Sequence, residues 1–388
     1  MKTIKALHVA SFNGNVGDNA NHNGFRNRLK EIINATILYT EIEMREFYQS
    51  WGLRDFNSEE FIRLCNKHDV IIIGGGNFFE LKWEYSYTGT TVNISNETLE
   101  KINSPIFFNA LGCDLYKGST KKTIDNFKSF INRLTKSDKY FISVRNDGSY
   151  ETIVNILGQD NAKKIHKAFD GAFHLKIKNF NYQEINNKYK AIGINIVSDM
   201  KDIRFENNNG ITYKEFIKIF SELINKFFEK HKDYQMVLFP HIYSDLDAIC
   251  DIMSNIRDIY RRTRIVVAPC LTGTGSEEYI FGLYKKCDFI MGMRFHSNVC
   301  AIAQNIPTIA LSSYKKIDDL YSELCLSDRV VRVNKKGFEQ DLIQLINYTI
   351  LNKEAVTEKY RRINLKINLD SKEYYNSVLL WFRNNVLK

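Results

Sequence analysis

The chain of 388 residues contains no long apolar run. Its longest uninterrupted apolar stretches, such as Val70–Ile73 and Ile265–Ala268, fall far short of the roughly 20 residues that a helix needs to span a bilayer. The amino-terminal stretch has only a brief apolar run and no small-residue cleavage site, so it predicts a first strand rather than a secretory signal. We therefore expect a soluble, cytoplasmic protein without a transmembrane helix.

Motifs for disulfides, metals and common nucleotide cofactors are also missing. The cysteines show neither a C-x-x-C pair nor regular spacing, which predicts buried free thiols in a reducing compartment. No H-E-x-x-H motif and no paired His and Cys spacing occurs, so we expect no obligatory metal. The Gly74-Gly75-Gly76 turn lacks both the Lys-Ser/Thr of a P-loop and the G-x-G-x-x-G spacing, which disfavours ATP and NAD as cofactors. The seven cysteines are Cys65, Cys113, Cys250, Cys270, Cys287, Cys300 and Cys325.

Positive charge is in excess, with 54 Lys and Arg residues against 45 Asp and Glu residues and a formal net charge of +9. Such a balance favours anionic partners, which include phosphorylated metabolites, a phosphate-bearing carrier lipid, an anionic membrane face and nucleic acid. Charge alone does not choose among them. Because the sequence has no zinc-finger spacing, no RNP-like motif and no concentrated basic arm, we expect no nucleic-acid partner.

Short β-branched runs alternate with turns and with stretches of helical spacing, which indicates a layered α/β fold. The expected strands form two series, separated by a polar segment, Lys176–Lys190, that we interpret as a linker. The first series is Ile4–Ala10, Val70–Ile73, Ile106–Ala110 and Tyr140–Val144, and the second is Ala191–Ile196, Gln235–Phe239, Ile265–Ala268, Phe289–Met291 and Thr308–Leu311. The sequence thus predicts two α/β domains that face a cleft, over residues 1–178 and 190–350.

Helix signals mark the second domain and the end of the chain. Thr212 with Glu215 predicts a capping box at the start of a helix. The carboxyl-terminal segment 351–388 is expected to form helices that pack back on the body. Tyr374, Val378 and Trp381 fall near helical spacing there, which fits either docking on the protein or an amphipathic contact with a membrane.

Polar side chains gather where the expected strands end, and the segment Asp288–His296 is the most informative case. A buried strand runs into a turn that holds Arg294 and His296, and Ser297 is placed to cap the next helix. The carboxyl edge of a parallel sheet binds ligands beside helix amino termini, which favour anions. A guanidinium there suits a carboxylate or phosphate, and an imidazole suits proton transfer. For His296 alone, a purely structural turn histidine remains the alternative.

Other strand ends carry further candidates. Asp18 lies in the loop after the first strand, where it is either a functional carboxylate or a helix-capping residue. His241 follows the strand Gln235–Phe239 and is either a second functional imidazole or part of a structural turn. Lys315 and Lys316 follow the strand Thr308–Leu311, where they are either solvated or one wall of an anion pocket. Asp114 and Asp147 also follow strands and are candidates to orient hydroxyl groups.

Taken in order along the chain, these segments resemble the polysaccharide pyruvyl transferase family. The resemblance rests on Gly292-x-Arg294-x-His296 with Pro307, Tyr314 and Lys316 after it, and on Asn15-x-Gly17-Asp18, Gly74-Gly75-Gly76, Ser143-Val-Arg145 and Asp170-x-Ala172-Phe173. It implies a glycosyltransferase-B-like architecture of two Rossmann-like domains. The final motif departs from the family, which often places Asp-Pro before the lysine, so either Lys315 or Lys316 is left to contact the donor.

The resemblance also implies a reaction, in which phosphoenolpyruvate is the co-substrate and a sugar of a cell-surface polysaccharide is the acceptor. His296 matches the catalytic histidine, and Asp18 is our second catalytic candidate. Arg145, Arg294 and Lys316, with Lys315 and His241, are expected to bind the donor, and Asn15, Asp114 and Asp147 the acceptor. A polyprenyl-diphosphate-linked acceptor at the membrane fits the positive charge. The rival interpretation is a glycosyltransferase of the same architecture that uses a nucleotide sugar.

Overall fold

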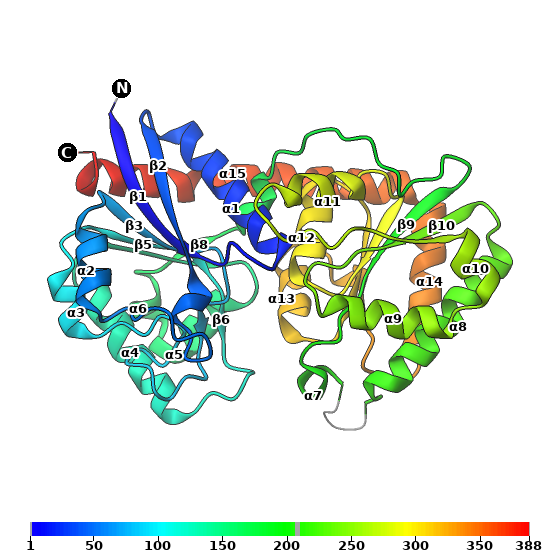
Figure 1. The fold of residues 1–388 in the computed structure, drawn as a ribbon, viewed down its shortest axis with the longest axis horizontal. Helices are drawn as coiled ribbons and strands as arrows, with labels where there is room; N and C mark the ends of the chain where they lie inside the picture. Colours follow the sequence, from blue (N-terminus) through cyan, green and yellow to red (C-terminus); the bar gives the residue numbers. More distant parts are fainter. Residues whose placement is uncertain (1, 206–209, 388) are drawn as a thin grey trace. The chain divides into compact units, whose positions relative to one another are not determined.

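Residues 2–205 and 210–387, as described by the computed structural model, fold into two compact α/β units (Figure 1). Unit 1 comprises Met1–Phe12, Gly24–Gly171 and Ile367–Lys388, and unit 2 comprises Asn13–Asn23 and Ala172–Lys366. Helix α1 (Val16–Ile32) therefore begins in unit 2 and ends in unit 1, and helix α15 (Lys353–Asn385) does the same.

These boundaries differ from the predicted domains in two respects. The loop that carries Asp18, which we expected in the first domain, belongs to unit 2. The segment Lys176–Lys190, expected to be a linker, also belongs to unit 2, where the ring of Tyr182 lies 5.1 Å from that of Tyr279. Sequence composition identified the polar character of this segment but not the aromatic side chain that holds it in place.

Unit 1 is built on a parallel sheet in the order β2-β1-β3-β5-β7-β8. Its strands are β1 (Thr3–Ala10), β2 (Thr36–Glu43), β3 (Val70–Gly74), β5 (Ile106–Leu111), β7 (Tyr140–Arg145) and β8 (His166–Ala168), and β4 (Phe79–Glu80) pairs separately with β6 (Cys113–Asp114). The remaining elements are η1 (Met44–Phe47), α2 (Glu59–Asn66), α3 (Asn96–Lys101), α4 (Lys121–Leu134), α5 (Ser149–Leu157), α6 (Gln159–Ala162) and η2 (Gly171–His174).

The central strands of unit 1 are apolar throughout because both faces of the sheet are buried. Ile71 and Ile73 pack into a core on the side of helices α2, α3 and α4. Val70 and Ile72 point the other way, into a second core that contains side chains of α1 and α15. The period of two along the strand thus divides one apolar run between two cores.

The end of α15 belongs to this second core. Val378 and Phe382 are fully buried, and Trp381 is nearly so. Tyr374 forms hydrogen bonds with Ser143 Oγ (2.9 Å) and Asn109 Oδ1 (3.2 Å). The apolar face of this helix is therefore covered by the core of unit 1 and is not exposed to a lipid surface.

Unit 2 is built on a second parallel sheet, in the order β11-β10-β9-β12-β13-β14. Its strands are β9 (Lys190–Asn195), β10 (Tyr234–Leu238), β11 (Ile265–Val267), β12 (Phe289–Gly292), β13 (Thr308–Ser312) and β14 (Val330–Arg332). Its other elements are α7 (Lys201–Arg204), α8 (Tyr213–Lys230), α9 (Asp245–Asn255), α10 (Asp258–Thr263), α11 (Ser276–Tyr284), α12 (Phe295–Ala303), α13 (Lys315–Glu323), η3 (Ser327–Arg329) and α14 (Phe338–Leu351).

The strand order of unit 2 is that of a doubly wound Rossmann fold, and it reverses direction at β9. From β9 the chain first builds outward through β10 and β11, and then returns to build β12, β13 and β14 on the other side. Helices α8 and α14 contact each other on one face of the sheet, and α11 and α12 contact each other on the opposite face (Figure 1). Ligands of such folds bind beside the carboxyl ends of the two strands at the reversal, here β9 and β12.

Two local expectations have clear outcomes. The capping box at Thr212 and Glu215 is confirmed, with both reciprocal hydrogen bonds present at the start of α8. The cap at Ser297 is wrong, because α12 begins earlier, with Arg294 at its N-cap. Ser297 Oγ instead donates a hydrogen bond to the Arg294 carbonyl (2.9 Å), which tightens the first turn.

The seven cysteines are all free thiols in the described part of the chain. Four of them are buried as expected, whereas Cys250 and Cys325 are exposed and Cys270 is partly exposed. Among residues 2–205 and 210–387, no helix combines the length and the apolar character that crossing a bilayer requires.

Candidate functional site

The segment Asn13–Asn23 packs on unit 2 through a series of polar contacts. The Val16 amide donates to the His241 carbonyl (3.2 Å), and Asn19 Nδ2 donates to the carbonyls of Thr272 and Gly273 (both 3.2 Å). Asn23 Nδ2 donates to the buried Glu277 carboxylate (2.7 Å). These contacts place the first turn of α1 against the carboxyl edge of the second sheet.

Asn15 organises this first turn and orients Asp18. Its Oδ1 accepts a hydrogen bond from the Gly17 amide (3.0 Å), as an N-cap side chain does. Its Nδ2 donates to Asp18 Oδ2 (2.9 Å). Asn15 therefore supplies the helix cap, and Asp18 lies in the first turn, where the helix dipole favours a carboxylate.

Asp18 and His296 face each other across a short gap, with Asp18 Oδ1 3.8 Å from His296 Nδ1. Gly17 makes this approach possible, because a Cβ at that position would lie 2.5 Å from the Cβ and 2.6 Å from the Nδ1 of His296. Both side chains are largely buried. The carboxylate thus lies beside the imidazole, an arrangement of groups that suits general acid and base chemistry.

Arg294, two residues earlier, is held by two carboxylates of unit 2. Its Nε donates to Asp245 Oδ2 (2.7 Å), its Nη2 donates to Asp245 Oδ1 (2.5 Å), and its Nη1 donates to Asp199 Oδ2 (3.2 Å). Its backbone amide donates to Asn195 Oδ1 at the end of β9 (2.9 Å). The bidentate grip expected for a donor anion is occupied by Asp245, so the visible role of Arg294 is to fix the β12–α12 turn that carries His296.

Asp245 connects this ion pair to the next strand end. It is fully buried and accepts hydrogen bonds from the amides of His241 (2.9 Å) and Ile242 (3.3 Å). An isolated buried carboxylate would be costly, and here the Arg294 guanidinium and the two amides compensate its charge. Asp245 therefore joins the loop after β10 to the turn after β12.

His241 itself lies inside the protein. Its side chain is fully buried, and its Nε2 forms a hydrogen bond with Tyr284 Oη (2.8 Å). Burial, with smaller contributions from the charges of Arg294 and His296, holds the pKa of His241 well below its usual value. The imidazole is therefore neutral near pH 7, and the structure favours its structural interpretation over contact with a donor.

The two lysines after β13 have different surroundings. Lys315 is about half exposed and pairs with Asp319 on the same helix, at 2.5 Å. Lys316 is buried, with only 7% of its surface exposed. Both lie in the first turn of α13, whose N-cap residue is Tyr314. Of the two, Lys316 is the cation that the fold holds inside the protein.

The remaining candidates belong to unit 1. Arg145 Nε donates to Asp147 Oδ2 (2.7 Å), and its Nη1 lies 3.6 Å from Asp170 Oδ2, all three side chains being buried. Asp147 also accepts a hydrogen bond from Ser149 Oγ. Asp114, in β6, is buried and accepts from the Tyr116 amide (2.8 Å). Arg145 thus forms ion pairs inside its own unit, as Arg294 does.

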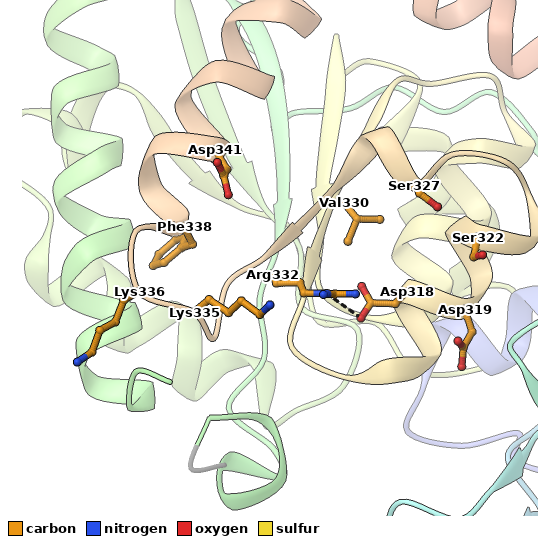
Figure 2. A pocket seen from close by; sticks show the side chains of 10 residues that line it. All are labelled: Asp318, Asp319, Ser322, Ser327, Val330, Arg332, Lys335, Lys336, Phe338 and Asp341. Atoms are coloured by element: carbon orange, nitrogen blue, oxygen red, sulfur yellow. Dashed lines mark hydrogen bonds and ion pairs between the residues drawn. The ribbon is translucent and has the colours of Figure 1, made fainter. Parts of the chain in front are cut away.

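A cavity of about 550 Å³ lies beyond β14, at the edge of unit 2. Three cations (Arg332, Lys335, Lys336) and three carboxylates (Asp318, Asp319, Asp341) line it, so their formal charges cancel. Figure 2 shows Lys335 extending toward Arg332 and Asp318, whose side chains are 3.3 Å apart, whereas Lys336 points away. A neutral, mixed lining does not select a highly charged anion.

No cluster of three or more His, Cys, Asp or Glu side chains is placed to hold a metal ion among the residues that the structure describes. The Gly74–Gly76 turn serves the packing of unit 1, because a Cβ on Gly74 would overlap the backbone of Asn109. The Gly75 amide donates to the Asn109 carbonyl (3.1 Å) in the same contact.

Several residues of the site were not identified from the sequence. Asn195 ends β9, and Asp199 and Arg204 follow it, so their position near the end of a predicted strand was the only available signal. Asp199 and Asp245 each bind Arg294, yet nothing in the spacing of the three residues indicates that they meet. The tertiary fold alone brings these charges together.

The two units define the class of architecture to which the chain belongs. It is similar over its full length to a glycosyltransferase from Rickettsia africae ESF-5, with a TM-score of 0.56, 12% identity and coverage of 100% of each chain. It is also similar to a structure of OtsA without ligand, with a TM-score of 0.52, 10% identity, and coverage of 97% of this chain and 99% of the other. At such low identity these likenesses establish the fold, two Rossmann-like domains of the glycosyltransferase-B type.

The family follows from the sequence pattern over this fold. The model of the polysaccharide pyruvyl transferase family matches residues 15–314, which is more than half of the chain. The chain therefore belongs to the polysaccharide pyruvyl transferase family. No curated protein sequence matches it. The matched region begins at Asn15 and ends at Tyr314, so it includes Asp18, Arg294 and His296.

Proposed function

We propose that this protein transfers the pyruvyl group of phosphoenolpyruvate to two hydroxyls of a sugar in a cell-surface polysaccharide or its lipid-linked precursor. The observation that carries the proposal is the Asp18–His296 pair, 3.8 Å apart at the carboxyl edge of a Rossmann-like sheet, in a chain of this family. Such a pair supplies the proton transfers that ketal formation requires.

The reaction needs a proton relay but no net supply of protons. A proton adds to the methylene carbon of phosphoenolpyruvate, and the first sugar hydroxyl attacks the adjacent carbon. The bond from that carbon to the phosphate oxygen then breaks, and the second hydroxyl closes the ketal. Of the two hydroxyl protons, one ends on the new methyl group and the other on the released phosphate. One acid and base centre that is protonated and deprotonated in turn is sufficient.

His296 is assigned to this relay and Asp18 to its support. Because Nδ1 of His296 faces Asp18, proton exchange with the substrate is assigned to Nε2. The carboxylate stabilises the imidazolium that forms when the ring accepts a hydroxyl proton. Asn15, through its hydrogen bond to Asp18, keeps the carboxylate in this orientation.

The donor is close to a trianion at neutral pH, so its pocket needs several cations. Lys316 and the amino termini of α12 and α13, which follow the adjacent strands β12 and β13, are assigned to this role. Lys315, Arg145 and Arg294 all form ion pairs with carboxylates of their own unit. We therefore assign Lys315 and Arg294 to supporting positions in the site of unit 2, and Arg145 to the internal stability of unit 1.

The deciding experiment measures acceptor-dependent release of phosphate from phosphoenolpyruvate by the purified full chain. The expected result is release that needs both substrates and is lost in the H296Q variant, while circular dichroism and thermal unfolding stay unchanged. The rival function, glycosyl transfer from a nucleotide sugar, is tested in a parallel reaction with UDP-sugars. Consumption of a UDP-sugar, with phosphoenolpyruvate ignored for every glycan offered, would exclude pyruvyl transfer.

A further inference from the structure

Two arginines lie side by side at the carboxyl edge of unit 2, and their surroundings differ sharply. Arg294 is bound by Asp245 through two nitrogens and by Asp199 through a third. Arg204, at the end of α7, is more deeply buried than Arg294, with 7% of its surface exposed. Its side chain makes one hydrogen bond, from Nη1 to Ser313 Oγ (3.1 Å), among the residues that the structure describes.

The charge of Arg204 is compensated only in part. Its Nε lies 3.4 Å from Asp199 Oδ1, but without a hydrogen bond between the two buried atoms. The same carboxylate already binds Arg294. Burial, opposed in part by Asp199 and reinforced by the positive charge of Arg294, lowers the pKa of Arg204. A guanidinium has five N–H donors, and beyond the bond from Nη1 to Ser313 those of Arg204 make no hydrogen bond to the part of the chain that the structure describes.

The backbone around Arg204 is held in place, so this arrangement is built into the fold. The Arg204 carbonyl accepts a hydrogen bond from Asn334 Nδ2 (2.9 Å). The guanidinium carbon lies 5.7 Å from the centre of the Tyr314 ring, on the strand end that also carries Ser313. A buried and poorly paired cation destabilises a protein, and its retention is expected where a ligand completes the pairing.

The position of Arg204 is that of a ligand-binding residue. Arg204 follows β9, His296 follows β12, and Ser313 follows β13, and these three strands are neighbours in the sheet. The strand order reverses at β9 and β12, which is where ligands of this fold bind. The shared contact with Asp199 links Arg204 to Arg294, two residues before the proposed catalytic imidazole.

We infer that Arg204 is the guanidinium that binds the anionic donor, with its unused N–H groups directed to the phosphate or carboxylate of phosphoenolpyruvate. Arg294, by contrast, orients the turn that carries His296. This inference rests on the proposed function and adds to it a donor-binding residue that lies outside the sequence motifs of the site. A planar fork of N–H donors matches both anionic groups of the donor.

Isothermal titration of the full chain with phosphoenolpyruvate tests the inference, with R204Q and R204K compared with wild type. Loss of a charge-assisted contact predicts a Kd raised by about 10- to 100-fold in R204Q, and by less in R204K, which keeps the charge. The matched control is K201Q, which removes an exposed cation from the same short helix and should leave the Kd unchanged. Thermal unfolding without ligand should show all four proteins folded, with R204Q at least as stable as wild type because the poorly paired buried charge is removed.

Three outcomes separate the possibilities. Donor binding by wild type that is unchanged in R204Q would overturn the role of Arg204 and leave pyruvyl transfer standing. Failure of the wild-type protein to bind phosphoenolpyruvate would overturn the proposed function and this inference with it. If R204Q does not fold, R204K decides the matter, because an unchanged Kd in that variant would contradict contact with the donor.

Discussion

Gly17 and His296 are in contact at a distance that only glycine permits, since a Cβ on Gly17 would lie 2.5 Å from the His296 Cβ. The backbone of Gly17 does not have the positive φ that requires glycine for conformational reasons. The requirement is therefore one of space, and it ties the first turn of α1 to the position of the imidazole.

The first prediction concerns this contact. In G17A the added methyl displaces either the helix turn or the His296 ring, and we expect the rate of phosphate release to fall at least tenfold with little change in thermal stability. G273A is the matched control, because a Cβ there meets no atom within 4 Å in a backbone without positive φ. Equal activity of the two variants would show that the ring tolerates the displacement.

The second prediction concerns the carboxylate that faces His296. In D18N the size of the side chain is retained but its negative charge is lost, so the protonated imidazole is less stabilised. We expect kcat to fall by about 10² to 10⁴, the usual contribution of acid and base groups. The control is D233N, which removes an exposed carboxylate at the start of β10, the opposite edge of the sheet. A wild-type kcat in D18N would show that Asp18 has no catalytic role and only stabilises the amino terminus of α1.

The third prediction concerns the buried ion pair of Arg294. The R294Q substitution leaves Asp245 inside the protein without its guanidinium, and we expect a loss of about 3 to 5 kcal/mol in the free energy of unfolding. Urea unfolding monitored by circular dichroism provides the measurement, because all three tryptophans lie in unit 1 and would not report on unit 2. Each single variant leaves one charge of the pair without its partner, whereas the double variant R294Q/D245N removes both charges. The loss of stability in the double variant should therefore be smaller than the sum of the single losses. Additive losses would argue against a direct pairing.

The fourth prediction concerns pH. Burial keeps the pKa of His241 well below its usual value in the folded state, whereas the unfolded chain titrates near about 6.5. Below that pH the unfolded state binds the extra proton, so stability falls as the pH falls, by at most about 1.4 kcal/mol per pH unit from this residue. Replacing His241 by Gln should flatten the decline between about pH 6.5 and pH 5. Parallel curves for the two proteins would contradict a buried neutral imidazole.

The sequence predicts the central strands well, but among the outer strands it predicts only β11 (Ile265–Val267). The apolar runs Val70–Ile73 and Ile106–Ala110 lie within β3 and β5, since strands buried on both faces carry no polar residues. Strand β2 was not predicted, because its half-exposed residues mix polar and apolar side chains. Strand β14 was not predicted, because its two valines lie between Arg329 and the exposed Arg332 and form no longer apolar run. Edge strands are defined by the neighbours they pair with, more than by composition.

The same distinction applies to the site. Strand ends and turn residues pointed to Asp18 and His296, and the structure brings these two together. The partners of Arg294 were not predicted, because a basic residue after a strand looks the same whether a ligand or a protein carboxylate binds it. Whether Arg294 binds a ligand or a protein carboxylate depends on where Asp199 and Asp245 point after β9 and β10. Local sequence does not encode these directions. Arg204 was missed for the same reason.

The final turns of α15 have a consequence for biosynthesis. Unit 1 is complete only when Tyr374, Val378 and Phe382 cover one face of its sheet, yet most of that sheet is synthesised before residue 171. At translation rates of about 5 to 20 residues per second, this face of the sheet stays uncovered for about 10 to 40 s until the end of α15 is synthesised. During that interval unit 2 emerges while unit 1 still exposes apolar strands. A stop codon in the last helix would leave the candidate site of unit 2 complete in a chain whose unit 1 still exposes one apolar face of its sheet.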